Sequence, residues 1–135
     1  MKVANTAGAV VVIDDNQVNR ELAVDILHAA GFTVFEAASG PAALTLIERT
    51  MPDVVLMDVQ MPGMSGFEVI AELRQHKDRR IATTTIIAIT GLAMPGDREH
   101  CLNAGADDYL SRPVQLLTLV ERVRTAARDS TRRDF

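Results

Sequence analysis

The stretch Val54–Gly66, VVLMDVQMPGMSG, joins an apolar run to an aspartate and then to a turn rich in proline and glycine. Four apolar residues in a row before Asp58 are typical of a parallel strand that is covered on both faces. The residues after the turn place apolar side chains at helical spacing: Phe67, Ile70 and Leu73. A strand, a turn and a helix in this order indicate one βα unit.

The same pattern recurs along the chain. Five β-rich runs alternate with segments of helical periodicity, which predicts an α/β fold with a parallel sheet and helices on both faces. The runs are Ala9–Ile13, Thr33–Ala37, Asp53–Met57, Thr85–Ile89 and Asp108–Ser111. We expect the second run at an edge of the sheet, because it contains Glu36. Residues typical of helix starts and ends flank the helical segments: Asn16, Gly31, Pro41, Pro52, Ser65, Gly105 and Pro113.

Composition limits the class of protein. The chain has 135 residues, of which 47% are hydrophobic and 24% charged, so one compact domain is expected. We place this domain at residues 8–127 and a polar C-terminal tail at 128–135. The formal charge of -4 disfavours nucleic acid or an anionic membrane as a partner. Without a signal peptide pattern or a run of about 20 apolar residues, a cytoplasmic protein is predicted.

Two further segments have plain structural interpretations. Cys101 is the only cysteine, so it can form neither an internal disulfide nor a thiolate metal cage, and we expect a small buried apolar residue. The basic cluster Arg74–Arg80 lies between a predicted helix and a predicted strand. A solvated loop is the favoured interpretation of this cluster, with a docking site as the alternative.

Polar residues follow several of the predicted strands. They are Asp14 and Asp15, Asp58, Thr90, and Ser111 with Arg112. In an open parallel sheet the carboxyl ends of the strands form one edge, where ligands bind. Carboxylates gathered there need a positive charge, and hard oxygen ligands without His or Cys suit Mg²⁺. Capping of the first helix would explain one of the two adjacent aspartates, but not the convergence.

Asp58 has the properties of a nucleophile. A lone carboxylate beside a metal can accept a phosphoryl group and form an acyl phosphate. Thr90 would then donate a hydrogen bond to the phosphoryl group, and Arg112 would neutralise it. Other phosphate chemistry fits less well: the Gly63-x-x-Gly66 pair is too weak for a dinucleotide motif, no P-loop is present, and Gln60 stands where a DxD hydrolase has its second acid. Neither a nucleotide-binding enzyme nor a hydrolase of the DxD kind is excluded outright.

Several separated motifs resemble one family. VVIDDN, VVLMDVQMPGMSG, IIAITG and GADDYLSRPV occur in the order found in receiver domains of two-component response regulators, in particular single-domain chemotaxis regulators. The resemblance covers about Gly8 to Ala127. It implies a flavodoxin-like fold with strand order 2-1-3-4-5.

The resemblance also implies roles for individual residues. Asp58 matches the phosphoacceptor, Asp14 and Asp15 match the acid pair that holds Mg²⁺, and the backbone carbonyl of Gln60 matches a further metal ligand. Thr90 matches the switch hydroxyl and Tyr109 the switch aromatic. A histidine kinase or histidine phosphotransfer protein is the implied phosphoryl donor. The implied surface for a downstream protein combines the helix before Gly105, the strand Asp108–Ser111 and the helix after it.

The chain departs from the family at Arg112, where the family pattern has lysine. Arginine is bulkier and offers a planar fork of donors in place of a compact ammonium. The family's peptide bond before the proline is cis, so a cis Arg112–Pro113 bond is predicted. Two rival functions follow: an interaction module that is independent of phosphorylation, with Asp58 locked by Arg112, and a metal-dependent phosphohydrolase.

Overall fold

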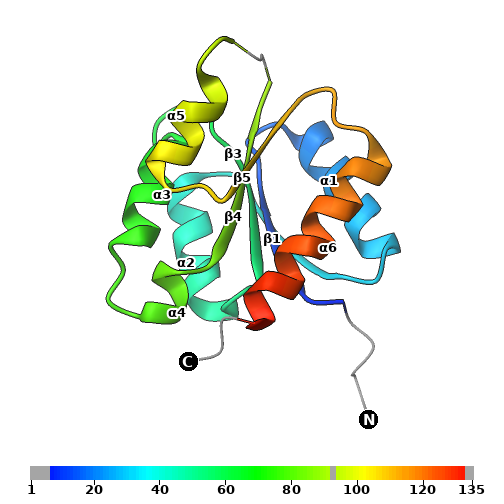
Figure 1. Ribbon diagram of the computed structural model, residues 1–135, viewed down its shortest axis with the longest axis horizontal. Coiled ribbons are helices and arrows are strands. Elements are labelled where there is room, and N and C mark those ends of the chain that lie inside the picture. Colours follow the sequence, from blue (N-terminus) through cyan, green and yellow to red (C-terminus); the bar gives the residue numbers. More distant parts are fainter. Residues whose placement is uncertain (1–6, 92–93, 133–135) are drawn as a thin grey trace.

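The computed structural model describes residues 7–91 and 94–132 and contains one five-stranded sheet (Figure 1). All the strand pairs are parallel, in the order β2-β1-β3-β4-β5. The fold class, the strand order and the edge position of the second strand are therefore confirmed. The strands are β1 (Ala9–Ile13), β2 (Thr33–Ala37), β3 (Val54–Asp58), β4 (Thr85–Thr90) and β5 (Asp108–Ser111).

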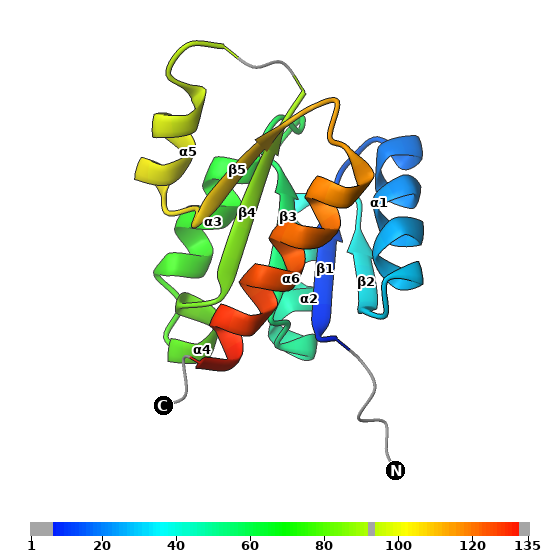
Figure 2. The same ribbon diagram turned by 45° about the vertical axis from the view of Figure 1, so that its right-hand side comes forward.

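Helices cover both faces of the sheet. Figure 1 places α1 and α6 on one side, and Figure 2 shows the same division from a second angle, with α2, α3, α4 and α5 on the other side. The helices are α1 (Gln17–Ala29), α2 (Gly40–Thr50), α3 (Gly66–Arg74), α4 (Arg79–Ala82), α5 (Asp97–Ala104) and α6 (Leu116–Arg132).

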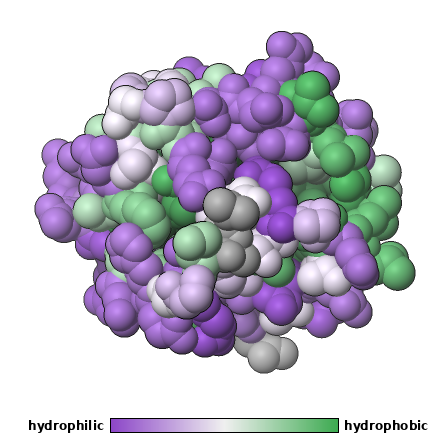
Figure 3. Space-filling model, turned by 90° about the horizontal axis from the view of Figure 1, so that it is seen from above, coloured by the Kyte–Doolittle hydropathy of each residue, from purple (hydrophilic) through white to green (hydrophobic). Residues whose placement is uncertain are grey.

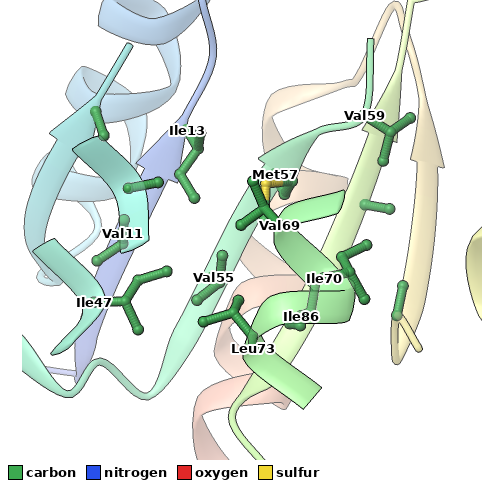
Figure 4. Packing of buried hydrophobic residues seen from close by; sticks show 14 of the residues in the cluster. Val11, Ile13, Ile47, Val55, Met57, Val59, Val69, Ile70, Leu73 and Ile86 are labelled. Carbon is green, nitrogen blue, oxygen red and sulfur yellow. The ribbon is translucent and has the colours of Figure 1, made fainter. Parts of the chain in front are cut away.

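Alternation along the strands divides the core into two layers. Val11 and Val55 pack with residues of α2 and α3, whereas Val10 and Val54 pack with residues of α1 and α6. Successive side chains of a strand point to opposite faces, so the middle of a strand that is buried on both faces is apolar throughout. Figure 4 shows the first layer, in which side chains of α2 and α3 pack against the sheet, with Ile47, Val69, Ile70, Leu73 and Ile86 among those labelled.

The predicted helix starts are largely confirmed. The Asn16 side chain accepts the backbone N–H of Asn19 at the start of α1, and Ser65 forms a capping box with Glu68 at the start of α3. The expected start of the last helix at Pro113 is wrong. Its first turn forms beyond Val114, where the carbonyl of Gln115 accepts the N–H of Leu119.

Helix α6 continues to Arg132, into the segment predicted as a tail. Residues 133–135 of that segment lie outside the described residues. The domain boundary at residue 127 stays a prediction.

The prediction of a solvated loop at Arg74–Arg80 is wrong for its last residues. Helix α4 begins at Arg79, because the Asp78 carboxylate accepts the N–H of Arg80 and Ile81 is buried beneath the turn. The buried side chain of Ile81 thereby holds this otherwise polar helix against the rest of the protein. The sequence pattern missed this helix because a single turn has too few residues to show a period.

The Arg74 side chain points inward and joins three segments. Its guanidinium donates to the carboxylate of Asp107 at 2.9 Å. It also donates to backbone carbonyl oxygens that belong to Ala82, Thr84 and Gly105. The first residue of the basic cluster is therefore structural, since it satisfies acceptors at the end of α4 and before β5.

We expect Arg74→Met to lower the free energy of unfolding by about 2–4 kcal/mol, because several carbonyl acceptors would lose their donor. Urea unfolding followed by circular dichroism measures this change. Arg80→Met is the matched control, since Arg80 is 69% exposed and pairs only loosely with Asp78, at 3.5 Å. Equal costs for the two substitutions would contradict a structural role for Arg74.

Candidate functional site

Three carboxylates meet at the carboxyl edge of the sheet. Asp14 follows β1 and Asp58 ends β3, and the register of the neighbouring strands pairs Ile13 with Met57. With Asp15 they form a cluster in which one carboxylate oxygen from each lies within 4.8 Å of the others. Asp14 and Asp58 are only 3% and 6% exposed, whereas Asp15 is exposed. The predicted convergence of these three residues is what the geometry shows.

Asp58 is held in an environment that disfavours its charge. Burial raises the pKa of its carboxyl to about 6, and the nearby Asp14 adds to the rise. Two contacts oppose it: the backbone N–H of Gln60 donates to Asp58 Oδ1 at 2.9 Å, and Arg112 lies nearby. The opposing contacts do not balance the burial, so the cluster carries negative charge that a further cation would stabilise.

Asp14 is bonded on both oxygens. Its Oδ1 accepts the backbone N–H of Asn16 at 2.9 Å, and its Oδ2 accepts Nη2 of Arg112. The helix cap itself is Asn16. Asp14 is therefore not the cap of α1, and its carboxylate belongs to the acidic cluster.

Arg112 makes its main contact with Asp14 rather than with Asp58. Its Nη1 lies 3.9 Å from Asp58 Oδ1, at the outer limit for an ion pair. The sequence interpretation paired Arg112 with Asp58 or with a phosphoryl group and did not consider Asp14. The Arg112–Pro113 peptide bond is cis, as predicted.

Thr90 and Tyr109 lie on neighbouring strands. Thr90 ends β4 and is buried, and Tyr109 is half-buried and pairs in register with Ala88. Since Ala88 and Thr90 are two residues apart, the two polar side chains share the face of the sheet that α3 and α5 cover. Burial, followed by the charge of Asp97, raises the pKa of Tyr109. Cys101 is buried in the same layer, as expected for an apolar residue.

A model of the response regulator receiver domain matches residues 10–124. The chain belongs to this family. A curated relative, the polar-differentiation response regulator DivK of Brucella ovis, is 33% identical over 122 residues, which cover 90% of this chain and 98% of that protein. The resemblance that the sequence motifs indicate is thereby confirmed.

Solved structures agree with the family. A putative response regulator from Chloroflexus aurantiacus superposes with a TM-score of 0.83 at 31% identity, covering 90% of this chain and 98% of the other. The chemotaxis protein CheY4 of Vibrio cholerae gives a TM-score of 0.80 at 29% identity, covering 87% and 97%. These TM-scores show that this receiver domain shares its fold with both structures.

Two features of the site were missed in the sequence. The sequence predicted a role only for the backbone carbonyl of Gln60. Its side-chain oxygen also accepts the N–H of Gly91 at 3.2 Å and so links the loops after β3 and β4. Gly66 lies against the backbone of Asp58 and Val59, where an added Cβ would be 2.6 Å from the Asp58 carbonyl oxygen. The available signal was a glycine directly after the helix cap Ser65.

A pocket of about 450 Å³ adjoins the carboxylates on the side of α1 and α6. Its lining includes Asp14, Asp58 and Arg112 and is otherwise mainly apolar, with Leu22, Ala23, Ile26, Val114 and Leu119. Figure 3 looks down on this edge and shows hydrophobic residues gathered over α1 and the start of α6. The exposed ones there include Val18, Leu22, Leu116 and Leu117.

The donor set of the acidic cluster fits a hard divalent cation. Three carboxylates converge without His or Cys ligands among the described residues of the cluster, and the raised pKa of Asp58 indicates uncompensated charge. Mg²⁺ accepts one or two carboxylates and keeps several waters. The receiver domain therefore has residues that could bind this ion.

Proposed function

We propose that this receiver domain is a phosphoacceptor switch, in which Asp58 takes a phosphoryl group from a histidine kinase or a histidine phosphotransfer protein. The main support is the convergence of Asp14, Asp15 and Asp58 at one sheet edge, with Asp58 buried beside a cation. Mg²⁺ is the proposed cofactor, held by these three carboxylates and by the backbone carbonyl of Gln60. Bound Mg²⁺ would supply positive charge for the transferring phosphoryl oxygens.

The proposed transfer is a displacement at phosphorus. A carboxylate oxygen of Asp58 forms a bond to the phosphorus of a phosphohistidine while the P–N bond breaks, and the imidazole leaves with the electron pair. The result is an acyl phosphate on Asp58. Arg112 and the Thr90 hydroxyl are placed at the ends of neighbouring strands, from which they would contact phosphoryl oxygens.

The proposed readout passes through Thr90 and Tyr109. A new charge at Asp58 attracts the Thr90 hydroxyl, and the space that it leaves admits the Tyr109 ring. This shifts the population of arrangements at the surface formed by α5, β5 and α6. A downstream protein would bind that surface.

The domain would act as a signalling module and not as a conventional enzyme, apart from its own phosphorylation and dephosphorylation. No helix among residues 7–91 and 94–132 is long and apolar enough to cross a membrane. We place the domain in the cytoplasm, where a kinase partner has access to Asp58, and propose no nucleic acid contact because the net charge is -4.

Incubation with acetyl phosphate and Mg²⁺ is expected to add one phosphate to each chain, detected by intact mass spectrometry as an acid-stable, base-labile adduct. Chelation of the metal before the reaction should prevent the adduct from forming. Asp14→Asn should reduce the rate of its formation at least tenfold, because one ligand of the cluster is lost.

Two other outcomes separate the rival functions. Continuous release of phosphate, well beyond one per chain, would support a phosphohydrolase. No adduct on the wild-type protein, together with partner binding unchanged by Asp58→Asn, would support an interaction module that does not use phosphorylation.

A further inference from the structure

Arg112 occupies a place that a bridging cation would need. Its Nη2 donates to Asp14 Oδ2, and its Nη1 lies 3.9 Å from Asp58 Oδ1. The other oxygen of Asp14 accepts the N–H of Asn16. Each oxygen of Asp14 therefore already accepts one hydrogen bond, and a metal that binds Asp14 would lie beside the positive charge of the guanidinium unless the guanidinium moves away.

Of the two donors on Asp14, only the guanidinium can leave easily. The N–H of Asn16 belongs to the backbone of the residue that caps α1. The Arg112 side chain is 24% exposed and borders the pocket of about 450 Å³ between α1 and α6. On its other side Gly91 has no side chain, and a Cβ there would be 3.8 Å from Nη1. The guanidinium thus has room to move.

We infer that Arg112 is a built-in counter-ion of Asp14 that competes with Mg²⁺ for this carboxylate. Coordination of Mg²⁺ by Asp14 displaces the guanidinium, so Arg112 sets the concentration of Mg²⁺ at which the site fills. This inference rests on the metal site of the proposed function. A guanidinium fork suits the role, because one nitrogen contacts Asp14 while another lies near Asp58.

The alternative explanation is general repulsion between Mg²⁺ and any arginine of the protein. Arg122 distinguishes the two explanations. It donates to Asp108 at 2.8 Å and has the same type of ion pair, but Asp108 begins β5 whereas Arg112 follows the end of that strand. Substitution of Arg122 removes the same charge without freeing a carboxylate of the acidic cluster.

The test is isothermal titration calorimetry with Mg²⁺ at fixed ionic strength and at about pH 8, where Asp58 is ionised. Arg112→Gln should bind Mg²⁺ at least about tenfold more tightly than the wild-type protein, because Asp14 no longer has to release a charged donor. Arg122→Gln should change the dissociation constant by less than about twofold. The Mg²⁺ affinity of Arg112→Lys should lie between those of Arg112→Gln and the wild-type protein, since a lysine keeps the charge and loses the fork.

A spectroscopic measurement covers the case in which Arg112→Gln does not fold. In the wild-type protein, saturating Mg²⁺ should shift or broaden the Nε–H resonance of Arg112 and leave that of Arg122 in place. An unmoved Arg112 resonance would overturn the inference. So would an affinity in Arg112→Gln that is equal to or weaker than that of the wild-type protein, or the absence of Mg²⁺ binding in all four proteins.

These measurements use no phosphoryl donor, so they fail separately from the proposed function. If acetyl phosphate leaves no adduct while the Mg²⁺ affinities follow the expected order, phosphorylation is wrong and the competition stands. If the adduct forms with Mg²⁺ while Arg112→Gln binds the ion no more tightly, only the competition is wrong.

Discussion

Asp58→Asn is expected to stabilise the protein by up to about 3 kcal/mol above pH 7 when no divalent cation is present. Burial raises the pKa of Asp58 from 3.8 to about 6, so the native state binds this proton more tightly than the unfolded chain does. Stability contributed by the bound proton is complete below about pH 4 and is lost as the pH rises through 6. A difference of about two pKa units corresponds to about 3 kcal/mol.

Asparagine cannot ionise, so the variant escapes this loss. Urea unfolding at about pH 4 and about pH 7.5 should show a difference between variant and wild type that is small at the lower pH and large at the higher. Asp25→Asn, at an exposed position of α1, should change the stability by less than about 0.5 kcal/mol at both. Equal stability of the Asp58→Asn and wild-type proteins at the higher pH would show that the charge of Asp58 is already compensated.

Mg²⁺ should narrow the difference in free energy of unfolding between Asp58→Asn and the wild-type protein. The ion binds the native state of the wild-type protein and stabilises it in proportion to the logarithm of its concentration above the dissociation constant. Asp58→Asn loses a charged ligand and should gain less. A larger gain for the variant than for the wild type would contradict a metal site that includes Asp58.

Gly66→Ala is expected to lower the free energy of unfolding by about 2–4 kcal/mol. The added Cβ would lie 2.5 Å from the Cα of Val59 and 2.6 Å from the carbonyl oxygen of Asp58, and both are backbone atoms. No flexible side chain can move aside, so either α3 or the end of β3 must shift. Urea unfolding measures the cost.

Gly63→Ala is the matched control in the same turn. Gly63 has a φ of 76° and no atom within 4 Å of an added Cβ, so its substitution carries only the cost of a left-handed conformation, about 1–2 kcal/mol. The two variants should also differ in the position of Asp58, because only the added Cβ of Gly66→Ala contacts its backbone. A smaller cost for Gly66→Ala than for Gly63→Ala would contradict the close approach.

The fold was predictable because the strands are short and nearly uniform in character. Three strands have the bounds that the sequence predicts, namely Ala9–Ile13, Thr33–Ala37 and Asp108–Ser111. The third strand begins and ends one residue later than predicted, at Val54 and Asp58, and the fourth extends one residue further, to Thr90. In both, the ladder continues onto the polar residue at the edge. The sequence placed these two side chains at the site, and the extra pairing is what holds them there.

The partners of the arginines could not be predicted. A parallel sheet brings Asp14, Asp58 and Arg112 to one edge, but their pairing depends on distances of a few ångström that periodicity does not contain. Arg74 shows the same limit, because its contacts at Gly105 and Asp107 join residues far apart in the chain. In both cases a single side chain satisfies several acceptors, and such sets are defined only by the assembled fold.

The measurement that tests phosphorylation of Asp58 most directly is the location of the adduct. After reaction with acetyl phosphate and Mg²⁺, borohydride reduction converts an acyl phosphate to an alcohol, and peptide mass spectrometry then identifies the modified residue. The proposed function predicts homoserine at position 58 in the wild-type protein and no reduced residue in Asp58→Asn. Modification at another aspartate, or an adduct that persists in Asp58→Asn, would contradict it.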